Sequence, residues 1–202
     1  MERLVPEEKA FRVSAVLLAA GAGRRFGDGG KLLAPYGGGR LIDGALRLAL
    51  ASPVEDIVLV TGSRGAEVAD HAAAMTDDPR LRRVVAADWA DGLSASLRAG
   101  IGAVAGEDAA LVLLGDMPRV PASVVEPLVA AVRAGAQAAA PMFQGQRGHP
   151  VAFSAALFPQ LLALTGDQGA GRLLAGLGEG LTLVEAPDDG VLYDVDTPGD
   201  LR

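Results

Sequence analysis

The chain has 202 residues, half of them hydrophobic, which suits one domain with a single core and disfavours a disordered or fibrous protein. Its formal net charge of −7 disfavours a protein that coats nucleic acid or anionic membrane, although a local cluster of cations can still bind an anion. The absence of cysteine excludes disulfides, thiolate metal sites and cysteine nucleophiles.

The first residues, MERLVPEEKAFR, are charged and contain no apolar run. We therefore expect residues 1–12 to form a poorly ordered leader and residues 13–202 to form one domain. The apolar run over residues 13–20 falls short of the roughly 18 residues that a membrane helix needs, and it is only a weak match to a signal peptide. We expect a cytoplasmic protein with no nucleic-acid or membrane partner.

Short apolar runs alternate with longer helical patterns in the first two thirds of the chain. This alternation is typical of an α/β domain with a mostly parallel sheet flanked by helices. The predicted strands cover residues 13–20, 56–62, 82–87 and 109–116. The predicted helices cover residues 41–51, 65–74, 92–104 and 120–135.

The pattern is less regular after residue 135. The sequence predicts strands over 136–143 and 150–154, a loop over 144–149, and short helices over 157–164 and 170–177. Residues 181–186 and 191–196 are predicted to be facing strands, because the stretch between them has turn composition. A final helix is expected to begin with Thr197 as its cap and Pro198 at its first position.

A glycine-rich loop follows the first predicted strand directly. Loops at the carboxyl ends of parallel strands bind ligands in open α/β sheets, and glycines let backbone N–H groups approach an anion. Arg24, Arg25 and Lys31 add positive charge, so the loop predicts a polyphosphate cradle. The dinucleotide fingerprint would need glycine where Phe26 stands, and the P-loop would need Ser or Thr where Leu32 stands. An NAD-dependent oxidoreductase is therefore disfavoured.

Three residues are candidate catalytic groups. Arg25 and Lys31 are expected to contact a triphosphate, and Lys31 is one of only two lysines in the chain. Asp116 ends a predicted strand at the ligand-binding edge of the sheet, where a carboxylate could bind Mg²⁺ together with phosphate oxygens. The alternative for Asp116 is a turn or capping aspartate before Pro118.

The order of several motifs is distinctive. The loop reads LAAG-x-G-x-R-x-G-x-x-x-K, with matches at Leu18, Ala19, Ala20, Gly21, Gly23, Arg25, Gly27 and Lys31. GLSASLRAG (92–100), GDMP (115–118), GQRGHPVAF (145–153), GDQGAG (166–171) and DVDTPGDL (194–201) follow it. Over residues 13–202 the chain resembles small nucleotidyltransferases with a Rossmann-like domain, and within them the MocA-like molybdenum cofactor cytidylyltransferases.

This resemblance implies Mg²⁺-dependent transfer of a cytidylyl group from CTP to the molybdopterin cofactor, with release of pyrophosphate. LAAG, rather than LAGG, looks like the cytidylyl form of the loop. The implied nucleotide contacts are Leu18, Ala19, Ala20, Gly21, Gly23, Arg25, Lys31, Thr61 and Ser94. The implied metal ligands are Asp116 and Asp196, and the implied second-substrate residues are Arg147 and His149. A molybdoenzyme or its chaperone is an implied partner.

Simpler roles remain open at four of these positions. Ser94 is equally well an N-cap, Thr61 and His149 are equally well turn residues, and Asp196 could merely begin the last helix. Asp194 competes with Asp196 for the metal.

The chain departs from the family pattern on the second-substrate side. Gly171 stands at a usual arginine position, and Arg172, one step later, would point elsewhere on a helix. Two alternative functions stay open: transfer to another small phosphorylated acceptor, such as a methylerythritol or sugar phosphate, and a non-catalytic module that binds nucleotide or pterin.

Overall fold

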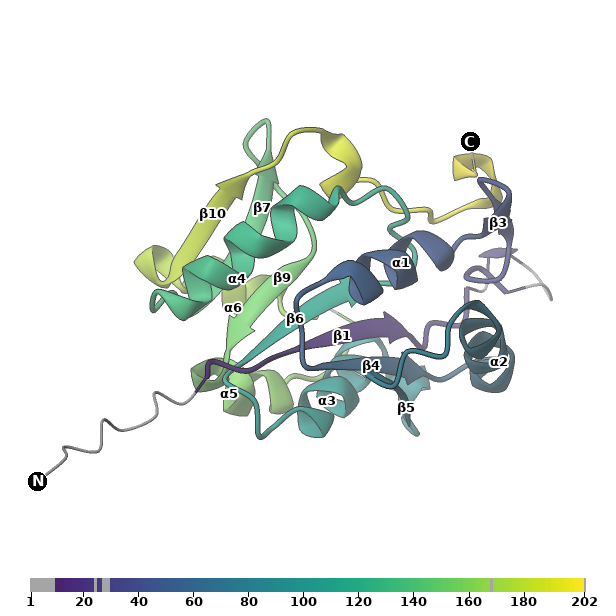
Figure 1. Cartoon of the computed structure of the whole chain (residues 1–202), viewed down its shortest axis with the longest axis horizontal. Helices are drawn as coiled ribbons and strands as arrows, with labels where there is room; N and C mark the ends of the chain where they lie inside the picture. The colour runs from purple at the N-terminus through teal and green to yellow at the C-terminus, as the bar shows by residue number, and fades with distance from the viewer. Residues whose placement is uncertain (1–9, 24, 27–29, 168, 202) are drawn as a thin grey trace, which may run out of the picture.

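A mixed, mostly parallel sheet forms the centre of the computed structural model, which describes residues 10–23, 25–26, 30–167 and 169–201 (Figure 1). Among these residues, its strands are β1 (Val13–Ala19), β4 (Asp56–Thr61), β5 (Leu81–Val85), β6 (Ala109–Leu114), β7 (Ala138–Phe143), β8 (Gln146–Arg147), β9 (Val151–Ser154) and β10 (Leu181–Glu185). The order is β10-β7-β9-β6-β1-β4-β5, with β8 paired to β7. Most of the charged leader predicted over residues 1–12, and the predicted cradle residues Arg24 and Gly27, lie outside the described residues.

The predicted parallel sheet is confirmed, and its register positions the loops that follow the strands. β1 is buried along its whole length and pairs in parallel with both β4 and β6. Ala19 lies opposite Thr61, and Leu18 lies opposite Leu114. The segments that leave these three strands therefore start from the same edge of the sheet, where open α/β sheets bind ligands. β8 and β9 are the antiparallel exceptions.

Helices cover both faces of the sheet (Figure 1). They are α1 (Asp43–Ala51), α2 (Gly65–Met75), α3 (Leu93–Ala103), α4 (Val125–Arg133), α5 (Phe158–Leu162) and α6 (Gly171–Gly176). Side chains of α1, α2 and α4 pack in one hydrophobic cluster, and those of α3, α5 and α6 pack in a second. β1 serves both clusters, because Leu17 joins the first and Leu18 the second, as alternation along a strand requires.

Several short elements complete the fold. β2 (Pro35–Tyr36) and β3 (Gly39–Arg40) form a small antiparallel pair outside the main sheet. The 3₁₀ turns are η2 (Trp89–Asp91), η3 (Ala122–Val124), η4 (Ala155–Leu157), η5 (Gly178–Gly180), η6 (Asp189–Val191) and η7 (Pro198–Asp200). Thr197 caps η7 through a reciprocal capping box with Asp200, and Pro198 is its first residue, so the expected helix start forms as a single 3₁₀ turn.

The predicted hairpin between residues 181–186 and 191–196 is wrong. β10 instead pairs in parallel with β7, and residues 191–196 form no strand. Val191 and Val195 are fully buried, so the apolar residues that suggested a strand pack against the body of the domain. The Val195 N–H donates to the carbonyl of Asp116 at 3.1 Å, which holds this segment at the edge of the sheet where β6 ends.

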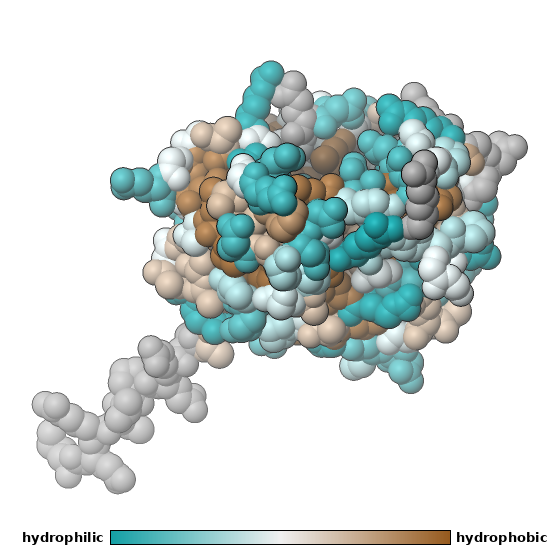
Figure 2. All heavy atoms as spheres, turned by 90° about the horizontal axis from the view of Figure 1, so that it is seen from above, coloured by the Kyte–Doolittle hydropathy of each residue, from teal (hydrophilic) through white to brown (hydrophobic). Residues whose placement is uncertain are grey.

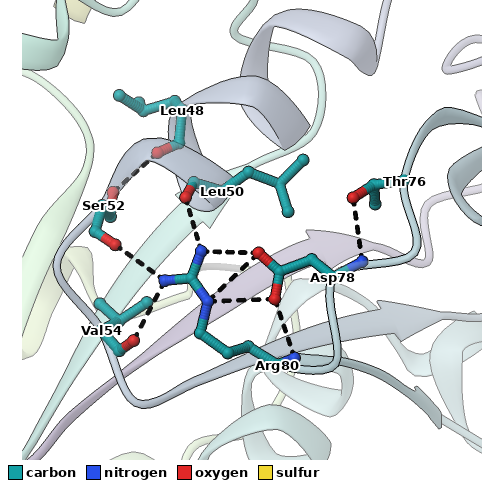
Figure 3. Close-up of polar contacts among 7 residues, drawn as sticks. All are labelled: Leu48, Leu50, Ser52, Val54, Thr76, Asp78 and Arg80. Carbon is teal, nitrogen blue, oxygen red and sulfur yellow. Dashed lines mark hydrogen bonds and ion pairs between the residues drawn. The ribbon is translucent and has the colours of Figure 1, made fainter.

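Arg80 joins the end of α1 to the turn before β5 (Figure 3). Its guanidinium donates to the carbonyls of Leu50, Ser52 and Val54 at 2.8–3.2 Å, and it forms an ion pair with Asp78 at 2.7 Å. The last carbonyls of a helix have no partner within the helix, so a side chain that satisfies them stabilises its end.

The surface mixes hydrophilic and hydrophobic residues, with hydrophobic ones gathered on the side where β10 and α4 lie (Figure 2). Leu183 of β10 is among the large apolar side chains left exposed. In the part of the chain that the structure describes, no helix combines the length and the apolar character needed to cross a membrane.

Candidate active site

A cleft of about 560 Å³ opens at the carboxyl edge of the sheet. One wall is the glycine-rich loop after β1, with Lys31, and the opposite wall is η2 with the start of α3. Asp116 and Asp196 lie beside the loop, and Asp167 also lines the cleft. The predicted cradle residues Leu18, Ala19, Ala20, Gly21, Gly23, Arg25 and Lys31 all line this cleft.

Lys31 lies between two carboxylates. Its Nζ donates to Oδ2 of Asp116 at 2.6 Å and to Oδ1 of Asp196 at 3.0 Å. Arg25 is more distant, with a guanidinium nitrogen 3.8 Å from Oδ2 of Asp196. Lys31 follows β1, Asp116 follows β6 and Asp196 comes directly after Val195. The fold therefore brings these three side chains together from positions far apart in the chain.

The electrostatic balance of this group favours a charged lysine. Burial disfavours the ammonium form of Lys31, but the attraction and hydrogen bond of Asp116, and then those of Asp196, outweigh it. The pKa of Lys31 is therefore raised above its ordinary value, and the residue is a permanent cation at neutral pH.

Glycine is required where the loop meets the lysine. Gly23 has φ +56°, a conformation that side chains rarely adopt, and a Cβ built there would lie 2.5 Å from the Cβ of Lys31. The loop backbone and the first carbons of the lysine side chain are thus packed directly together. This contact fixes the base of the Lys31 side chain, and the two carboxylates hold its far end.

The donor set suits a hard divalent cation. Oxygens of Asp116 and Asp196 converge on one point, the Lys31 ammonium, and carboxylate oxygen is the ligand that Mg²⁺ prefers. Among the described residues no group of three or more His, Cys, Asp or Glu side chains is placed to hold a metal. A site with two carboxylates fits Mg²⁺, which keeps several waters and takes further oxygens from phosphate.

Asp194 lies outside the cleft lining. Burial, and then repulsion by Asp196 and Asp116, raise the pKa of the Asp194 carboxyl above its usual value. Of the two competing carboxylates, Asp196 lines the cleft and Asp194 does not, so Asp196 is the better placed to bind a metal there.

Two predicted nucleotide contacts do not line the cleft. Ser94 is fully buried in the first turn of α3, where Gly92, not Ser94, is the N-cap. Thr61 is also fully buried, and its hydroxyl donates to the carbonyl of Val84 and accepts a hydrogen bond from Arg83 at 2.9 Å. Both side chains are therefore buried in the domain and do not face the cleft.

Three further residues with polar or aromatic side chains line the cleft and were not predicted from the sequence: Trp89, Ser96 and Asp167. No sequence signal marked Ser96, which lies three residues after Leu93 on the same helix face, and both line the cleft. Trp89 is the only tryptophan and precedes α3, and Asp167 lies in the GDQGAG motif. Neither the face of the tryptophan nor the approach of Asp167 to Gly92 could be deduced from spacing.

The predicted second-substrate residues lie apart from the cleft lining. Arg147 is exposed on β8. His149 packs with Met117, Val120 and Pro150, and its Nδ1 is buried with no hydrogen-bond partner among the residues that the structure describes. Burial lowers the pKa of His149 to about 4, with Asp116 opposing and Arg147 reinforcing the shift. His149 is therefore neutral at pH 7.

A family model and two known proteins match most of this sequence. The family model described as the MobA-like NTP transferase domain matches residues 15–182. The nicotine blue oxidoreductase of Paenarthrobacter nicotinovorans is 34% identical over 192 residues, 92% of each chain. The purine catabolism protein PucB of Bacillus subtilis is 34% identical over 190 residues, 91% of each chain.

Solved structures resemble the whole domain. A nucleotidyl transferase from Methanothermobacter superposes with a TM-score of 0.76 at 30% identity, covering 94% of both chains. A Mycobacterium tuberculosis protein in complex with manganese superposes with a TM-score of 0.74 at 25% identity, covering 94% of this chain and 95% of that one.

Proposed function

The chain belongs to the family of MobA-like NTP transferase domains and is a nucleotidyltransferase; from this premise we propose that it transfers the cytidylyl group of CTP to the molybdopterin cofactor. The observation that carries the proposal is the cation of Lys31 between Asp116 and Asp196, beside a glycine-rich loop that lines an open cleft. This arrangement offers positive charge for a triphosphate and carboxylate oxygen for a metal within one small volume.

Asp116 and Asp196 are the proposed ligands of Mg²⁺. When bound, Mg²⁺ supplies positive charge that polarises the phosphate oxygens and stabilises charge in the transition state. Asp116 is fixed at the end of β6, and Asp196 is held by the backbone hydrogen bond from Val195 to Asp116. The manganese complex of the Mycobacterium tuberculosis protein supports a divalent cation in this fold.

The reaction needs no nucleophile from the protein. A phosphate oxygen of the acceptor attacks the α-phosphorus of CTP and forms the new P–O bond. The bond from the α-phosphorus to the oxygen that bridges to the β-phosphorus breaks, and pyrophosphate leaves with its electron pair. Lys31 and Arg25 neutralise the leaving group, and the backbone N–H groups of the glycine-rich loop orient the triphosphate.

Arg147 and His149 are the proposed contacts on the second-substrate side. Arg147 is an exposed cation that could pair with an acceptor phosphate. His149 is neutral and half-buried, so its contribution would be a directed hydrogen bond from the imidazole instead of charge.

The decisive experiment is pyrophosphate release by the purified protein with molybdopterin cofactor, Mg²⁺ and either CTP or GTP. We expect release with CTP to be at least about tenfold faster, a difference of about 1.4 kcal/mol in transition-state binding. Equal or reversed rates would remove the cytidylyl assignment. Release with CTP and a methylerythritol or sugar phosphate, but not with molybdopterin, would transfer the assignment to that acceptor.

A second candidate function follows from one relative. The similarity to a protein named nicotine blue oxidoreductase makes reduction of a substrate the second candidate. The glycine-rich loop lacks the dinucleotide fingerprint, which disfavours that activity. Oxidation of NADH or NADPH, followed by absorbance with nicotine blue as acceptor, separates the two functions. Turnover of reduced nicotinamide without pyrophosphate release would favour the reductase.

A further inference from the structure

The Lys31 ammonium occupies the place where the two carboxylates converge. Its Nζ lies 2.6 Å from Asp116 and 3.0 Å from Asp196, and the side chain is only 12% exposed. An ammonium and a divalent cation cannot share these oxygens at contact distance, because two cations so close together repel strongly in a partly buried site. Lysine and metal are therefore competitors for the same carboxylates.

We propose that Lys31 closes the metal site in the nucleotide-free protein, and that an arriving triphosphate opens the site by drawing the ammonium onto its phosphate oxygens. The inference rests on the proposed function, because it takes Asp116 and Asp196 as the metal ligands. Its consequence is coupling: nucleotide and metal each favour the binding of the other beyond their own mutual contacts.

The geometry of the side chain supports such an exchange. The Cβ of Lys31 is packed against the backbone of Gly23, so a movement of the ammonium would have to come from rotation about the bonds beyond Cβ. Lysine carries a compact charge on a flexible stem, which suits movement between two sets of oxygens. In this exchange the triphosphate replaces the carboxylates around Lys31, and the metal replaces Lys31 between the carboxylates. The lysine and the two carboxylates therefore each keep a neighbour of opposite charge.

Arg25 provides a matched comparison. It carries the same charge and lines the same cleft, but its guanidinium lies 3.8 Å from Asp196 and its side chain is 70% exposed. It therefore screens one carboxylate weakly and does not lie between the two. Removal of charge at position 25 should have a much smaller effect on metal binding than removal at position 31.

The first test is Mn²⁺ binding to the nucleotide-free protein, followed by electron paramagnetic resonance. We expect Lys31→Met to bind Mn²⁺ about 10- to 100-fold more tightly than the wild type, as loss of charge-assisted hydrogen bonds to the ligands implies. Arg25→Met should change the affinity by less than about fivefold, the range of an exposed ion pair. Unchanged or weaker Mn²⁺ binding by a folded Lys31→Met protein would overturn the proposal.

The second test uses the wild type and so does not depend on the folding of a variant. With only two lysines in the chain, protein labelled with ¹³C at lysine Cε gives two signals, and Lys9 supplies the reference. We expect the Lys31 signal to shift on addition of an unreactive CTP analogue with Mg²⁺, and to need far more Mg²⁺ when the analogue is absent. Equal Mg²⁺ dependence with and without the analogue would overturn the proposal.

Neither measurement involves turnover. A failed pyrophosphate assay would therefore reject the proposed substrates without touching this exchange, and unaltered Mn²⁺ binding would reject the exchange without touching the substrates.

Discussion

Asp116 is the carboxylate whose contacts bear most directly on chemistry. It accepts the shortest hydrogen bond from Lys31 and also supplies the backbone carbonyl that anchors the segment carrying Asp196. Its side chain is 27% exposed, so it faces the cleft while remaining fixed at the end of β6.

Asp116→Asn should lower the rate of nucleotidyl transfer by about 10²- to 10³-fold, the loss expected when one electrostatic group is removed from a preorganised site. Single-turnover release of pyrophosphate measures the change. Asp194→Asn, two residues from the proposed ligand Asp196 but outside the cleft, is the matched control and should retain activity. Equal rates of pyrophosphate release by Asp116→Asn and wild type would contradict a role for Asp116 in the chemistry, whereas nucleotide binding by both proteins without any release would favour the non-catalytic binding module.

His149 predicts a specific response of stability to pH. Its pKa is lowered from 6.5 to about 4, so the unfolded chain binds more protons than the folded chain between these values. The contribution of His149 to the free energy of unfolding is therefore present above pH 6.5 and is lost as the pH falls towards 4. We expect this residue to contribute a loss of roughly 1.5 kcal/mol between about pH 7.2 and about pH 5.2.

Urea unfolding of wild type and His149→Gln at these two pH values isolates the contribution, because other titrating groups are common to both proteins. The variant should lose less stability on acidification. An identical pH dependence would show that the imidazole is accessible to protons in the folded state.

At the scale of elements, the strands were predictable where burial is continuous. β1, β4 and β6 are apolar runs covered on both faces, and the sequence predicts each to within one or two residues at its ends. The prediction is wrong for residues 191–196. Alternating apolar residues next to a turn are typical of a strand, but they occur equally in an irregular segment that buries two side chains. β10 pairs with β7 along one edge only, and residues 191–196 run instead to the end of β6, where the Val195 N–H donates to Asp116.

Arg80 connects α1 to the strand layer, and its loss should leave the carbonyls of Leu50 and Ser52 at the end of α1, and that of Val54 beyond it, without that donor. We expect Arg80→Ala to lower the free energy of unfolding by about 1–2 kcal/mol. Arg47→Ala, which removes an exposed arginine from the same helix, should cost less than about 0.5 kcal/mol. Chemical denaturation of both variants measures the difference, and equal effects would contradict a capping role for Arg80.

At the scale of the molecule, the site exists only when the chain is folded. Lys31 follows β1, Asp116 follows β6 and Asp196 lies far along the chain beyond β10, so the unfolded chain offers no comparable ligand set. The sequence located the loop and Asp116, because both follow buried parallel strands. It could not show that Lys31 bridges the carboxylates, because side-chain contacts between distant segments leave no periodic signal.

Ligand should therefore stabilise the folded state by mass action. An unreactive CTP analogue with Mg²⁺ at about 100 times its Kd should raise the free energy of unfolding by about 2.7 kcal/mol, which appears as a higher Tm. The GTP analogue at the same concentration should give a smaller shift, and Lys31→Met should reduce the shift with CTP. Equal shifts for both nucleotides would argue against selection of the base by this cleft.

The two edges of the sheet differ in a way that bears on handling of the protein in concentrated solution. β5 carries Arg82 and Arg83, and charge of this kind on an edge strand discourages pairing with a strand of another molecule. β10 reads LTLVE, and its Leu183 is 46% exposed. Such an edge has little charge along its length to deter a second strand. Unwanted self-association would therefore begin at β10, the edge of the sheet opposite β5.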